Sequence, residues 1–155
     1  MHALFHYEGV GRELVTALKY RHGRALVQPF GRLLAERLPV AEVDVVTWVP
    51  ASRQGRRRRG YDQGRLLARS VGRHTAVPTR RLLTRGAGPA QTGRSSRDRQ
   101  DGPVLSARRP GPGRVALVDD VVTTGATMRG SAAALRAAGW DPVVGLAVAV
   151  TPRQP

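Results

Sequence analysis

Hydrophobic and polar positions follow two patterns along this chain, one typical of buried strands and one typical of amphipathic helices. Short runs rich in branched apolar residues, bounded by glycine and proline, predict strands at 43–49, 80–83, 114–118 and 142–151. Apolar residues spaced three and four apart predict helices at 7–20, at 26–38, from Tyr61 onward and at 124–139. Strands that alternate with helices in this way predict an α/β fold with a mostly parallel sheet.

The stretch from Arg114 to Gly139 combines a strand, a turn and a helix without interruption. The segment Thr124-Gly125-Ala126-Thr127 opens the helix, and Gly139 ends it. Backbone N–H groups in the first turn of a helix are unpaired and lie at the positive end of the helix dipole. We therefore expect this turn to hold a phosphate group, with hydroxyl donors from Thr123, Thr124 and Thr127.

Two adjacent carboxylates, Asp119 and Asp120, lie at the carboxyl end of the predicted strand, where open α/β sheets bind their ligands. Ionised carboxylates only accept hydrogen bonds, so they suit the two donors of a vicinal diol, and they also suit a divalent cation. A diol site and a phosphate site on one short turn suggest a ribose 5-phosphate. The alternative is structural, because aspartate often ends a strand and caps a helix.

A second turn, Pro50-Ala51-Ser52-Arg53, follows the strand at 43–49. Small residues at the end of a strand leave backbone N–H groups free for an anion, and Arg53 adds a two-pronged guanidinium donor. The run from Arg56 to Arg59 comes next. Its three interpretations are a solvated loop, a nucleic-acid patch and part of a clamp for pyrophosphate.

Residues 84–113 are rich in Gly, Pro, Ser, Arg and Gln and contain few apolar side chains. A segment of this length and composition inside a domain is usually a functional loop or a disordered one. As a flexible loop it would bring cations such as Arg97 and Arg99 over an anionic ligand and exclude water. Disorder is the alternative interpretation.

The chain has 155 residues, enough for a single domain, 1–155, that buries about two-thirds of its unfolded surface. Its net charge of +15 attracts polyanions such as nucleic acid or a pyrophosphorylated sugar. The sequence contains no cysteine, which excludes thiolate metal sites, and its four histidines lack ligand spacing. We expect no metal site made by protein ligands alone, and any metal to be Mg²⁺ arriving with a phosphorylated substrate.

No apolar run is long enough to cross a membrane, and no leader peptide is visible. We therefore expect a cytoplasmic protein without membrane partners.

The segment VALVDDVVTTGAT, residues 115–127, resembles the 5-phosphoribosyl-1-pyrophosphate (PRPP) motif of type I phosphoribosyltransferases. By this resemblance Asp119 and Asp120 hold the ribose 2- and 3-hydroxyls. The 5-phosphate is then held by Thr123, Thr124, Gly125, Ala126 and Thr127. Purine-salvage members carry an aspartate two residues before the glycine of the motif, near the base nitrogen, whereas this chain has Thr123 there. A threonine hydroxyl is a poor proton acceptor at neutral pH, so we do not expect a copied purine mechanism.

Nearly the whole chain resembles the ComF family of competence-associated phosphoribosyltransferase-like proteins. The segment VPASRQGRRRRGYDQGRLLA matches the family pattern VP…R…RGxNQxxxLA, and LKYRHG matches its LK-aromatic-x-G element. The resemblance implies a type I phosphoribosyltransferase fold, with a central mostly parallel sheet flanked by helices. Residues 1–40 would form a helical hood, and Ala51, Ser52 and Arg53 would bind pyrophosphate.

The chain departs from the family pattern at three places. The family usually begins with a four-cysteine zinc module, so we expect a short form or a start downstream of the usual one. Asp62 stands where Asn is usual, and the loop at 84–113 lacks the usual Leu and Asn. The first difference leaves the catalytic core unchanged, whereas the other two bear on turnover.

The resemblance implies an enzyme that binds PRPP with Mg²⁺ and transfers the phosphoribosyl group to an acceptor that the sequence does not identify. Asp119, Asp120 and Arg53 would be its catalytic residues, with Lys19 as a distant candidate for the pyrophosphate side. The alternative is a non-catalytic protein of this fold that binds single-stranded DNA during DNA uptake. A homodimer stays open in either case.

Overall fold

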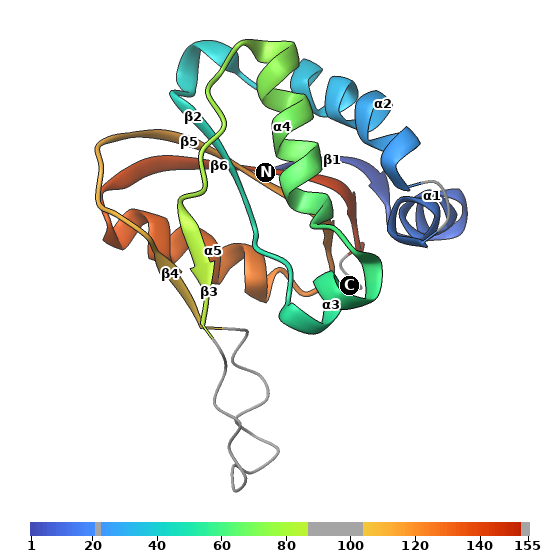
Figure 1. Cartoon of the computed structure of the whole chain (residues 1–155). Helices are drawn as coiled ribbons and strands as arrows, with labels where there is room; N and C mark the ends of the chain where they lie inside the picture. Colours follow the sequence, from blue (N-terminus) through green and yellow to red (C-terminus); the bar gives the residue numbers. More distant parts are fainter. Residues whose placement is uncertain (21–22, 87–103, 153–155) are drawn as a thin grey trace, which may run out of the picture.

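The structure is a computed structural model that describes residues 1–20, 23–86 and 104–152. Strands and helices alternate along most of the chain (Figure 1). In chain order the elements are β1 (His2–His6), α1 (Gly9–Tyr20), α2 (Gly23–Glu36), the short 3-10 helix η1 (Val40–Glu42), β2 (Val45–Trp48), α3 (Arg53–Arg59), α4 (Gln63–Thr75), β3 (Leu83–Arg85), β4 (Leu105–Ala107), β5 (Gly113–Val122), α5 (Ala126–Ala137) and β6 (Trp140–Val150).

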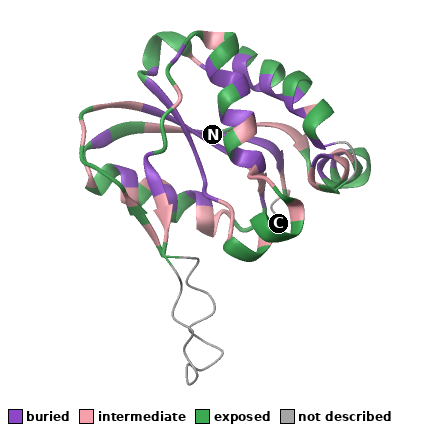
Figure 2. Cartoon of the chain, viewed as in Figure 1, coloured by how far each residue is buried: buried purple, intermediate pink, exposed green. Residues whose placement is uncertain are grey.

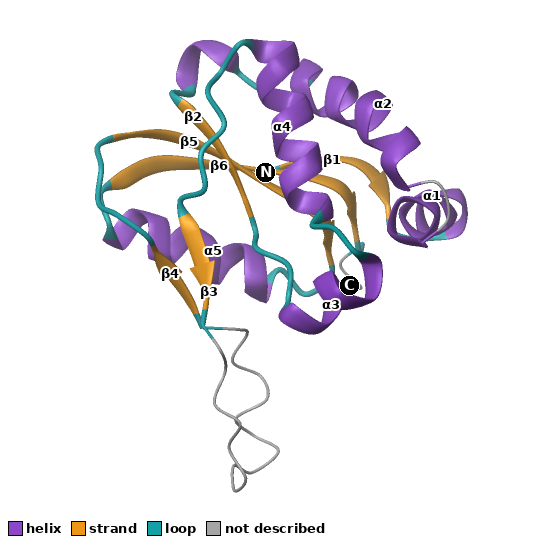
Figure 3. Cartoon of the chain, in the orientation of Figure 1, coloured by secondary structure: helices purple, strands orange, loops and turns teal. Residues whose placement is uncertain are grey.

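The central sheet of the described residues contains four strands in the order β1-β6-β5-β2, and every neighbouring pair is parallel. The long strands β5 and β6 form its middle, so they are buried by neighbours on both edges (Figure 3). A separate antiparallel pair joins β3 to β4. Because all four strands of the main sheet run the same way, their carboxyl ends meet at one edge, where ligands bind in folds of this kind.

Helices cover both faces of the sheet, with α1, α2 and α4 on one face and α5 on the other (Figure 1). Successive side chains of a strand point to opposite faces. Accordingly, Ala116 and Val118 of β5 pack in the core with α1, α2 and α4, whereas Val115 and Leu117 pack in the core with α5. Figure 2 shows that buried residues gather on the strands and on the sides of the helices that face them. In the described ranges, no helix combines the length and apolar character that a membrane span requires.

The prediction of a helical region at 1–40 holds for α1 and α2 but missed strand β1. His2–His6 is only half-buried and carries no long apolar run. It forms a strand because it pairs in parallel with β6, with Ala3 opposite Ala147 and Phe5 opposite Ala149. The strand predicted first, at 43–49, is therefore second in the chain, and it forms the opposite edge of the sheet as β2.

Two further predictions need correction near the β3–β4 pair. The strand predicted at 80–83 lies later, at Leu83–Arg85, while Thr79 makes an isolated bridge with Val46. The loop predicted at 84–113 is wrong at both ends, because residues 83–85 and 105–107 pair with each other as strands and β5 begins at Gly113. Leu83 is fully buried, so the pair is anchored in the core of the α5 face.

Candidate functional site

The acidic pair lies inside strand β5 rather than just after it. The sequence pattern ended this strand at Val118, but its pairing with β6 continues to Val122. The reason is that β6 is long enough to continue beside it, so Val121 and Val122 find partners in Ala149 and Val150. The two carboxylates are consequently held on a paired strand, not on a free loop.

Asp119 and Asp120 both line a cavity of about 210 Å³, which we name the acid-pair cavity. Its wall also includes Ala51 and Ser52 from the turn after β2, and Thr127 from the first turn of α5. The structure thus brings together residues from the two turns that the sequence predicted as anion sites. They meet because β2 and β5 are neighbouring parallel strands whose carboxyl ends lie side by side.

The carboxylates of the acidic pair receive hydrogen bonds mainly from the backbone that follows them. Asp119 Oδ1 accepts from the Asp120 N–H at 2.8 Å, and Asp120 Oδ1 accepts from the Val121 N–H at 2.8 Å. Burial raises the pKa of Asp119 well above its ordinary value, and the neighbouring Asp120 carboxylate raises it further, whereas Lys19 lowers it. The charged form of Asp119 is therefore destabilised until a ligand donates hydrogen bonds to it.

Lys19, which the sequence offered as a distant candidate for the pyrophosphate side, lies next to the acidic pair. Its Nζ is 3.5 Å from Asp120 Oδ2, and the two side chains are 24% and 17% exposed. The last turn of α1 carries this lysine into the acid-pair cavity. The amino-terminal helices thus contribute a cation directly to the candidate site.

The turn between β5 and α5 places its glycine in a conformation that other residues rarely adopt. Gly125 has a φ of +77°, in the left-handed region that favours glycine, and it is the N-cap of α5. The helix begins at Ala126 rather than at Thr124, because Thr124 Oγ1 accepts from the Ala126 N–H at 3.3 Å. Of the five residues predicted to hold a phosphate, Thr127 lines the acid-pair cavity. Thr123, Thr124 and Gly125 form the turn beside it, and Ala126 is the first residue of α5.

The predicted pyrophosphate turn borders two cavities. Ala51 and Ser52 line the acid-pair cavity and also a neighbouring groove of about 900 Å³, which Arg53 lines without reaching the acid-pair cavity. Ser52 caps α3, since its Oγ accepts from the Gly55 N–H at 3.0 Å.

The expectation of free backbone N–H groups in this turn is wrong for Ala51. The Ala51 N–H donates to Asp62 Oδ2 at 3.4 Å, while Asp62 Oδ1 accepts from the Arg65 N–H at 3.2 Å. Asp62 is the N-cap of α4. The aspartate at this position therefore has a structural role that joins the turn to the next helix.

The arginine run forms most of helix α3, so its interpretation as a loop is wrong. Arg56, Arg57 and Arg58 are exposed, whereas Arg59 is partly buried and lines the acid-pair cavity. The Nε of Arg59 is buried without a hydrogen-bond partner among the described residues. The run therefore presents cations to solvent and one guanidinium to the site.

Sequence reasoning missed two further residues of the acid-pair cavity. Gln63 is 1% exposed, and its Nε2 has no hydrogen-bond partner within the described part of the chain. Arg85 donates from Nη1 to the Pro50 carbonyl at 3.1 Å. Burial lowers the pKa of Arg85, and the nearby Asp119 charge partly opposes this shift. Gln63 belongs to the motif RGYDQ, which was a usable signal, whereas nothing local marks Arg85.

The described residues contain no cluster of three or more His, Cys, Asp or Glu side chains that could hold a metal ion. The donors present fit Mg²⁺ only as an ion that is shared between a substrate and the acidic pair. Arg97 and Arg99, which we predicted in the flexible loop, lie outside the described residues.

No family model and no curated protein gives a significant match to the chain. Among solved structures, the allosteric regulatory enzyme of purine biosynthesis matches with a TM-score of 0.59 and 28% identity, over 80% of this chain and 25% of that one. The glutamine PRPP amidotransferase from B. subtilis matches with a TM-score of 0.60 and 28% identity, over 80% of this chain and 26% of that one. The chain thus spans about a quarter of the length of these two proteins.

A purine phosphoribosyltransferase from Pyrococcus horikoshii Ot3 matches over most of both chains. Its TM-score is 0.53 and its identity 21%, over 83% of this chain and 78% of that one. The chain has the type I phosphoribosyltransferase fold, as its sequence predicted.

Proposed function

We propose that this protein binds PRPP together with Mg²⁺ and transfers the phosphoribosyl group to an acceptor. One observation carries the proposal. The acidic pair of β5, the first turn of α5 and the turn after β2 line a single small cavity at the carboxyl edge of the sheet. This combination offers acceptors for a diol beside donors for phosphate groups.

Each part of PRPP has a matching group in the proposed site. Asp119 and Asp120 accept hydrogen bonds from the two ribose hydroxyls, and residues 123–127 hold the 5-phosphate at the amino end of α5. Ser52 and Arg53 lie at the turn after β2 and serve the pyrophosphate. Lys19 adds a positive charge next to Asp120.

The proposed reaction is a displacement at C1 of the ribose. A bond forms between the acceptor nucleophile and C1, the bond from C1 to the pyrophosphate oxygen breaks, and pyrophosphate leaves with the electron pair. The residues act mainly through electrostatics, because cations stabilise the departing anion while the acidic pair orients the sugar. Mg²⁺, when bound, supplies positive charge to the pyrophosphate oxygens.

The comparisons support this proposal through the named activities of other proteins. One matched protein is a PRPP amidotransferase and another is a purine phosphoribosyltransferase. The resemblance of the sequence to the ComF family supports it as well and stays a prediction. Thr123 stands where the purine-salvage enzymes carry an aspartate, so the proposal does not include a purine acceptor activated in that way.

Calorimetric titration of the protein with PRPP in the presence of Mg²⁺ tests the proposal. We expect saturable binding that weakens when Mg²⁺ is removed with a chelator, followed by pyrophosphate release when an acceptor is added. Ribose 5-phosphate should bind more weakly, because it lacks the pyrophosphate that Ser52 and Arg53 serve. An absence of PRPP binding at millimolar protein and ligand would overturn the proposal.

A second candidate function is the binding of single-stranded nucleic acid without catalysis. It is favoured by the groove of about 900 Å³, which we name the arginine groove because six arginines line it: Arg53, Arg56, Arg65, Arg69, Arg81 and Arg85. A groove of this charge attracts a phosphate backbone. Its affinity for a single-stranded oligonucleotide would fall steeply with salt and would survive neutralisation of Asp119 and Asp120.

A further inference from the structure

Gln63 is a buried polar side chain whose amide nitrogen has no partner among the described residues. It is 1% exposed and lines the acid-pair cavity. Its Nε2 carries two N–H donors, and leaving a buried donor unpaired costs free energy. Buried polar side chains nearly always have a hydrogen-bond partner in folded proteins. An unpaired donor in the wall of a cavity is therefore a candidate for contact with a ligand.

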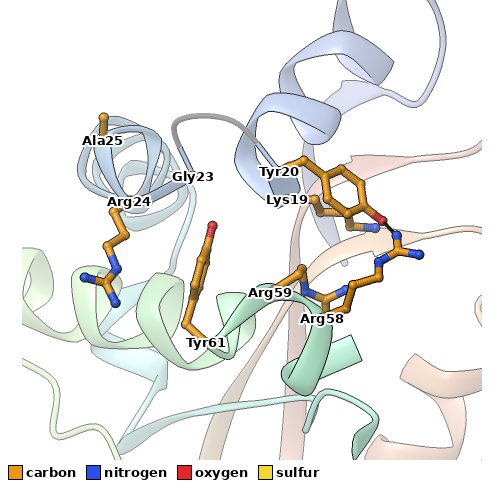
Figure 4. A pocket seen from close by; sticks show the side chains of 8 residues that line it. All are labelled: Lys19, Tyr20, Gly23, Arg24, Ala25, Arg58, Arg59 and Tyr61. Atoms are coloured by element: carbon orange, nitrogen blue, oxygen red, sulfur yellow. Dashed lines mark hydrogen bonds between the residues drawn. The ribbon is translucent and has the colours of Figure 1, made fainter. Parts of the chain in front are cut away.

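A second buried donor without a described partner, Arg59 Nε, lines the same cavity. Figure 4 shows Arg59 of α3 and Lys19 of α1 in the wall of an adjoining cavity of about 480 Å³. A Cβ added at Gly55 would lie 2.8 Å from Arg59 Nη2 and 3.0 Å from Ser52 Oγ. The guanidinium thus folds back over the start of α3, next to the turn after β2.

The location of these donors is selective. Among the described residues, three buried side-chain atoms lack a hydrogen-bond partner, and two of them line the acid-pair cavity. The third, Ser131 Oγ, belongs to α5 and lines none of the three cavities. Unpaired buried nitrogen donors therefore gather at the candidate site.

The start of α4 is held at the turn after β2, and this fixes the place of Gln63. Asp62 accepts a hydrogen bond from the Ala51 N–H at 3.4 Å. On the other side of Gln63, a Cβ added at Gly64 would lie 3.1 Å from the Val49 carbonyl oxygen, so the first turn of the helix packs closely against the end of β2. Gln63 accordingly lies at the turn that we propose for the pyrophosphate group.

Gln63 also supplies what this turn lacks. The Ala51 N–H is occupied by Asp62, so the backbone offers an anion one donor fewer than the sequence predicted. The Gln63 amide adds two N–H donors beside it. Although Asp119 and Asp120 line the same cavity, Gln63 Nε2 donates to neither. A ligand that satisfies all three residues must bring donors to the carboxylates and an acceptor to the amide, as PRPP does with its hydroxyls and its pyrophosphate.

We propose that Gln63 binds the pyrophosphate group of PRPP through its side-chain amide. The inference rests on the proposed function, and it adds a substrate-binding residue that neither predicted turn contains. As the bond from C1 to the pyrophosphate oxygen breaks, pyrophosphate leaves with the electron pair. The N–H donors of Gln63 stabilise the charge on the departing group, and the amide itself transfers no proton.

The substitution Gln63→Met tests this role, because methionine keeps the unbranched shape and removes both N–H donors. PRPP, pyrophosphate and ribose 5-phosphate are each titrated calorimetrically against the whole protein in the presence of Mg²⁺. We expect PRPP and pyrophosphate to bind about tenfold more weakly to the variant, because a hydrogen bond to a charged group is lost. Ribose 5-phosphate should bind equally to both proteins, because it has no pyrophosphate.

Two control variants separate binding from folding. Gln54→Met makes the same substitution at an exposed residue of α3 that lines none of the three cavities, and it should leave all three affinities unchanged. Ser131→Ala removes the unpaired buried hydroxyl of α5 and should also leave them unchanged. Neither Gln63→Met nor Ser131→Ala should lower the urea midpoint, because each removes a buried polar group that has no described partner. A purely structural role for Gln63 would instead lower the midpoint and weaken all three ligands.

A measurement on the wild-type protein does not depend on any variant. The side-chain NH₂ signals of Gln63 are assigned by triple-resonance NMR and followed during titration with pyrophosphate and Mg²⁺. We expect them to move as pyrophosphate saturates the site, and to move much less with ribose 5-phosphate.

Three outcomes would overturn the inference. The first is equal affinity for PRPP in the wild type and in Gln63→Met. The second is an equal loss of affinity for PRPP and for ribose 5-phosphate, which would assign the amide to the sugar or to the fold. The third is a set of Gln63 signals that stay in place while PRPP binds. Each of these leaves PRPP binding by the wild type standing, whereas a wild-type protein that does not bind PRPP would overturn the proposed function itself.

Discussion

Strand β5 carries charge at both of its ends, and the protein treats the two ends differently. At its amino end Arg114 pairs with Asp44, which precedes the neighbouring strand β2. At its carboxyl end Asp119 and Asp120 line the acid-pair cavity. Both regions contain carboxylates and lie along the neighbouring strands β2 and β5, at opposite ends, so the comparison separates the effect of local partners from the effect of the fold.

The amino-end carboxylate is fully satisfied by the protein. Asp44 accepts from the Arg114 backbone N–H at 2.8 Å, from its Nε at 3.1 Å and from its Nη2 at 2.9 Å. The side-chain hydrogen bonds from Arg114 are the largest reason why the pKa of Asp44 falls to about 2. A carboxylate held in this way has little capacity left for a ligand.

The carboxyl-end pair shows the opposite balance. Its main partners are backbone N–H groups of the adjacent residues, and its nearest described cation, Lys19, lies 3.5 Å from Asp120. Burial raises the pKa of Asp119 rather than lowering it. The difference indicates that the carboxylate at the amino end of β5 is paired within the protein, whereas the pair at the carboxyl end has the strained electrostatics that the proposed ligand site would use.

The largest effect should come from neutralising the carboxyl-end pair. We predict that Asp119→Asn with Asp120→Asn weakens PRPP binding by about a hundredfold or more, since two charged hydrogen bonds of roughly 1.5–3 kcal/mol each are lost. Calorimetric titration with PRPP and Mg²⁺ measures this loss, and circular dichroism checks that the variant folds. Asp44→Asn is the control at the other end and should bind PRPP like the wild type. Unchanged affinity in the double variant would contradict the ribose assignment.

The next effect concerns two glycines of the turn and helix that follow β5. Gly125 is in the left-handed region, and a Cβ there would lie 2.7 Å from Arg129 Nη1. We predict that Gly125→Ala lowers the free energy of unfolding by roughly 1–2 kcal/mol and weakens PRPP binding about tenfold. Gly130 is the matched control, because it is exposed on α5 with nothing within 4 Å of its Cβ position.

Gly130→Ala should raise the free energy of unfolding by roughly 0.5–1 kcal/mol and leave PRPP binding unchanged. Urea unfolding and calorimetry measure both quantities. Equal effects of the two substitutions on PRPP affinity would mean that the turn does not hold the phosphate.

The features that the sequence predicted correctly are local ones. The succession of apolar strand, acidic pair, glycine turn and helix lies within 26 consecutive residues, from Arg114 to Gly139, so neighbouring positions carry the whole signal. The same holds for α1 and α2, whose apolar spacing marks their buried faces. Fold class followed from the order of these elements.

The features that the sequence did not predict depend on distant partners. Strand β1 exists because β6 pairs with it. The segment itself is too short and too exposed to show a strand pattern in the sequence. Arg85 reaches Pro50 only because β3 pairs with β4. Asp62 was judged by its charge alone, whereas the hydrogen bond that it accepts from the Ala51 N–H becomes visible only when α4 lies beside the turn after β2.

A smaller effect should appear in stability when Asp119 alone loses its charge. Folding raises the pKa of Asp119, so its buried charge lowers the free energy of unfolding at pH values above that raised pKa. Below the ordinary value near 3.8 the carboxyl is protonated in both the folded and the unfolded state, so this effect is absent. We predict that Asp119→Asn raises the unfolding midpoint at pH 7–8 by roughly 2–4 °C, with no gain at pH values below about 4.

Thermal unfolding of both proteins from pH 4 to pH 8 measures this difference. Protonation of Asp119 leads to a second expectation. The affinity of the wild-type protein for PRPP should fall as the pH falls through the pKa of Asp119, because a protonated carboxyl accepts hydrogen bonds from a diol poorly. A variant that is less stable than the wild type across the whole range would contradict a destabilising charge at this end of β5.

The smallest effect should come from the amino end, and its pH dependence should have the opposite sign. A lowered pKa stabilises the folded state above the ordinary value near 3.8, and this contribution is lost as the pH falls through about 2. We predict that Asp44→Asn slightly lowers the unfolding midpoint at pH 5–7, because Asp44 and Arg114 are exposed and water screens their attraction. The difference should shrink as acid protonates the wild-type carboxyl. If Asp44→Asn and Asp119→Asn shifted the midpoint in the same direction at pH 7, the two ends of β5 would not differ in the way their hydrogen bonds indicate.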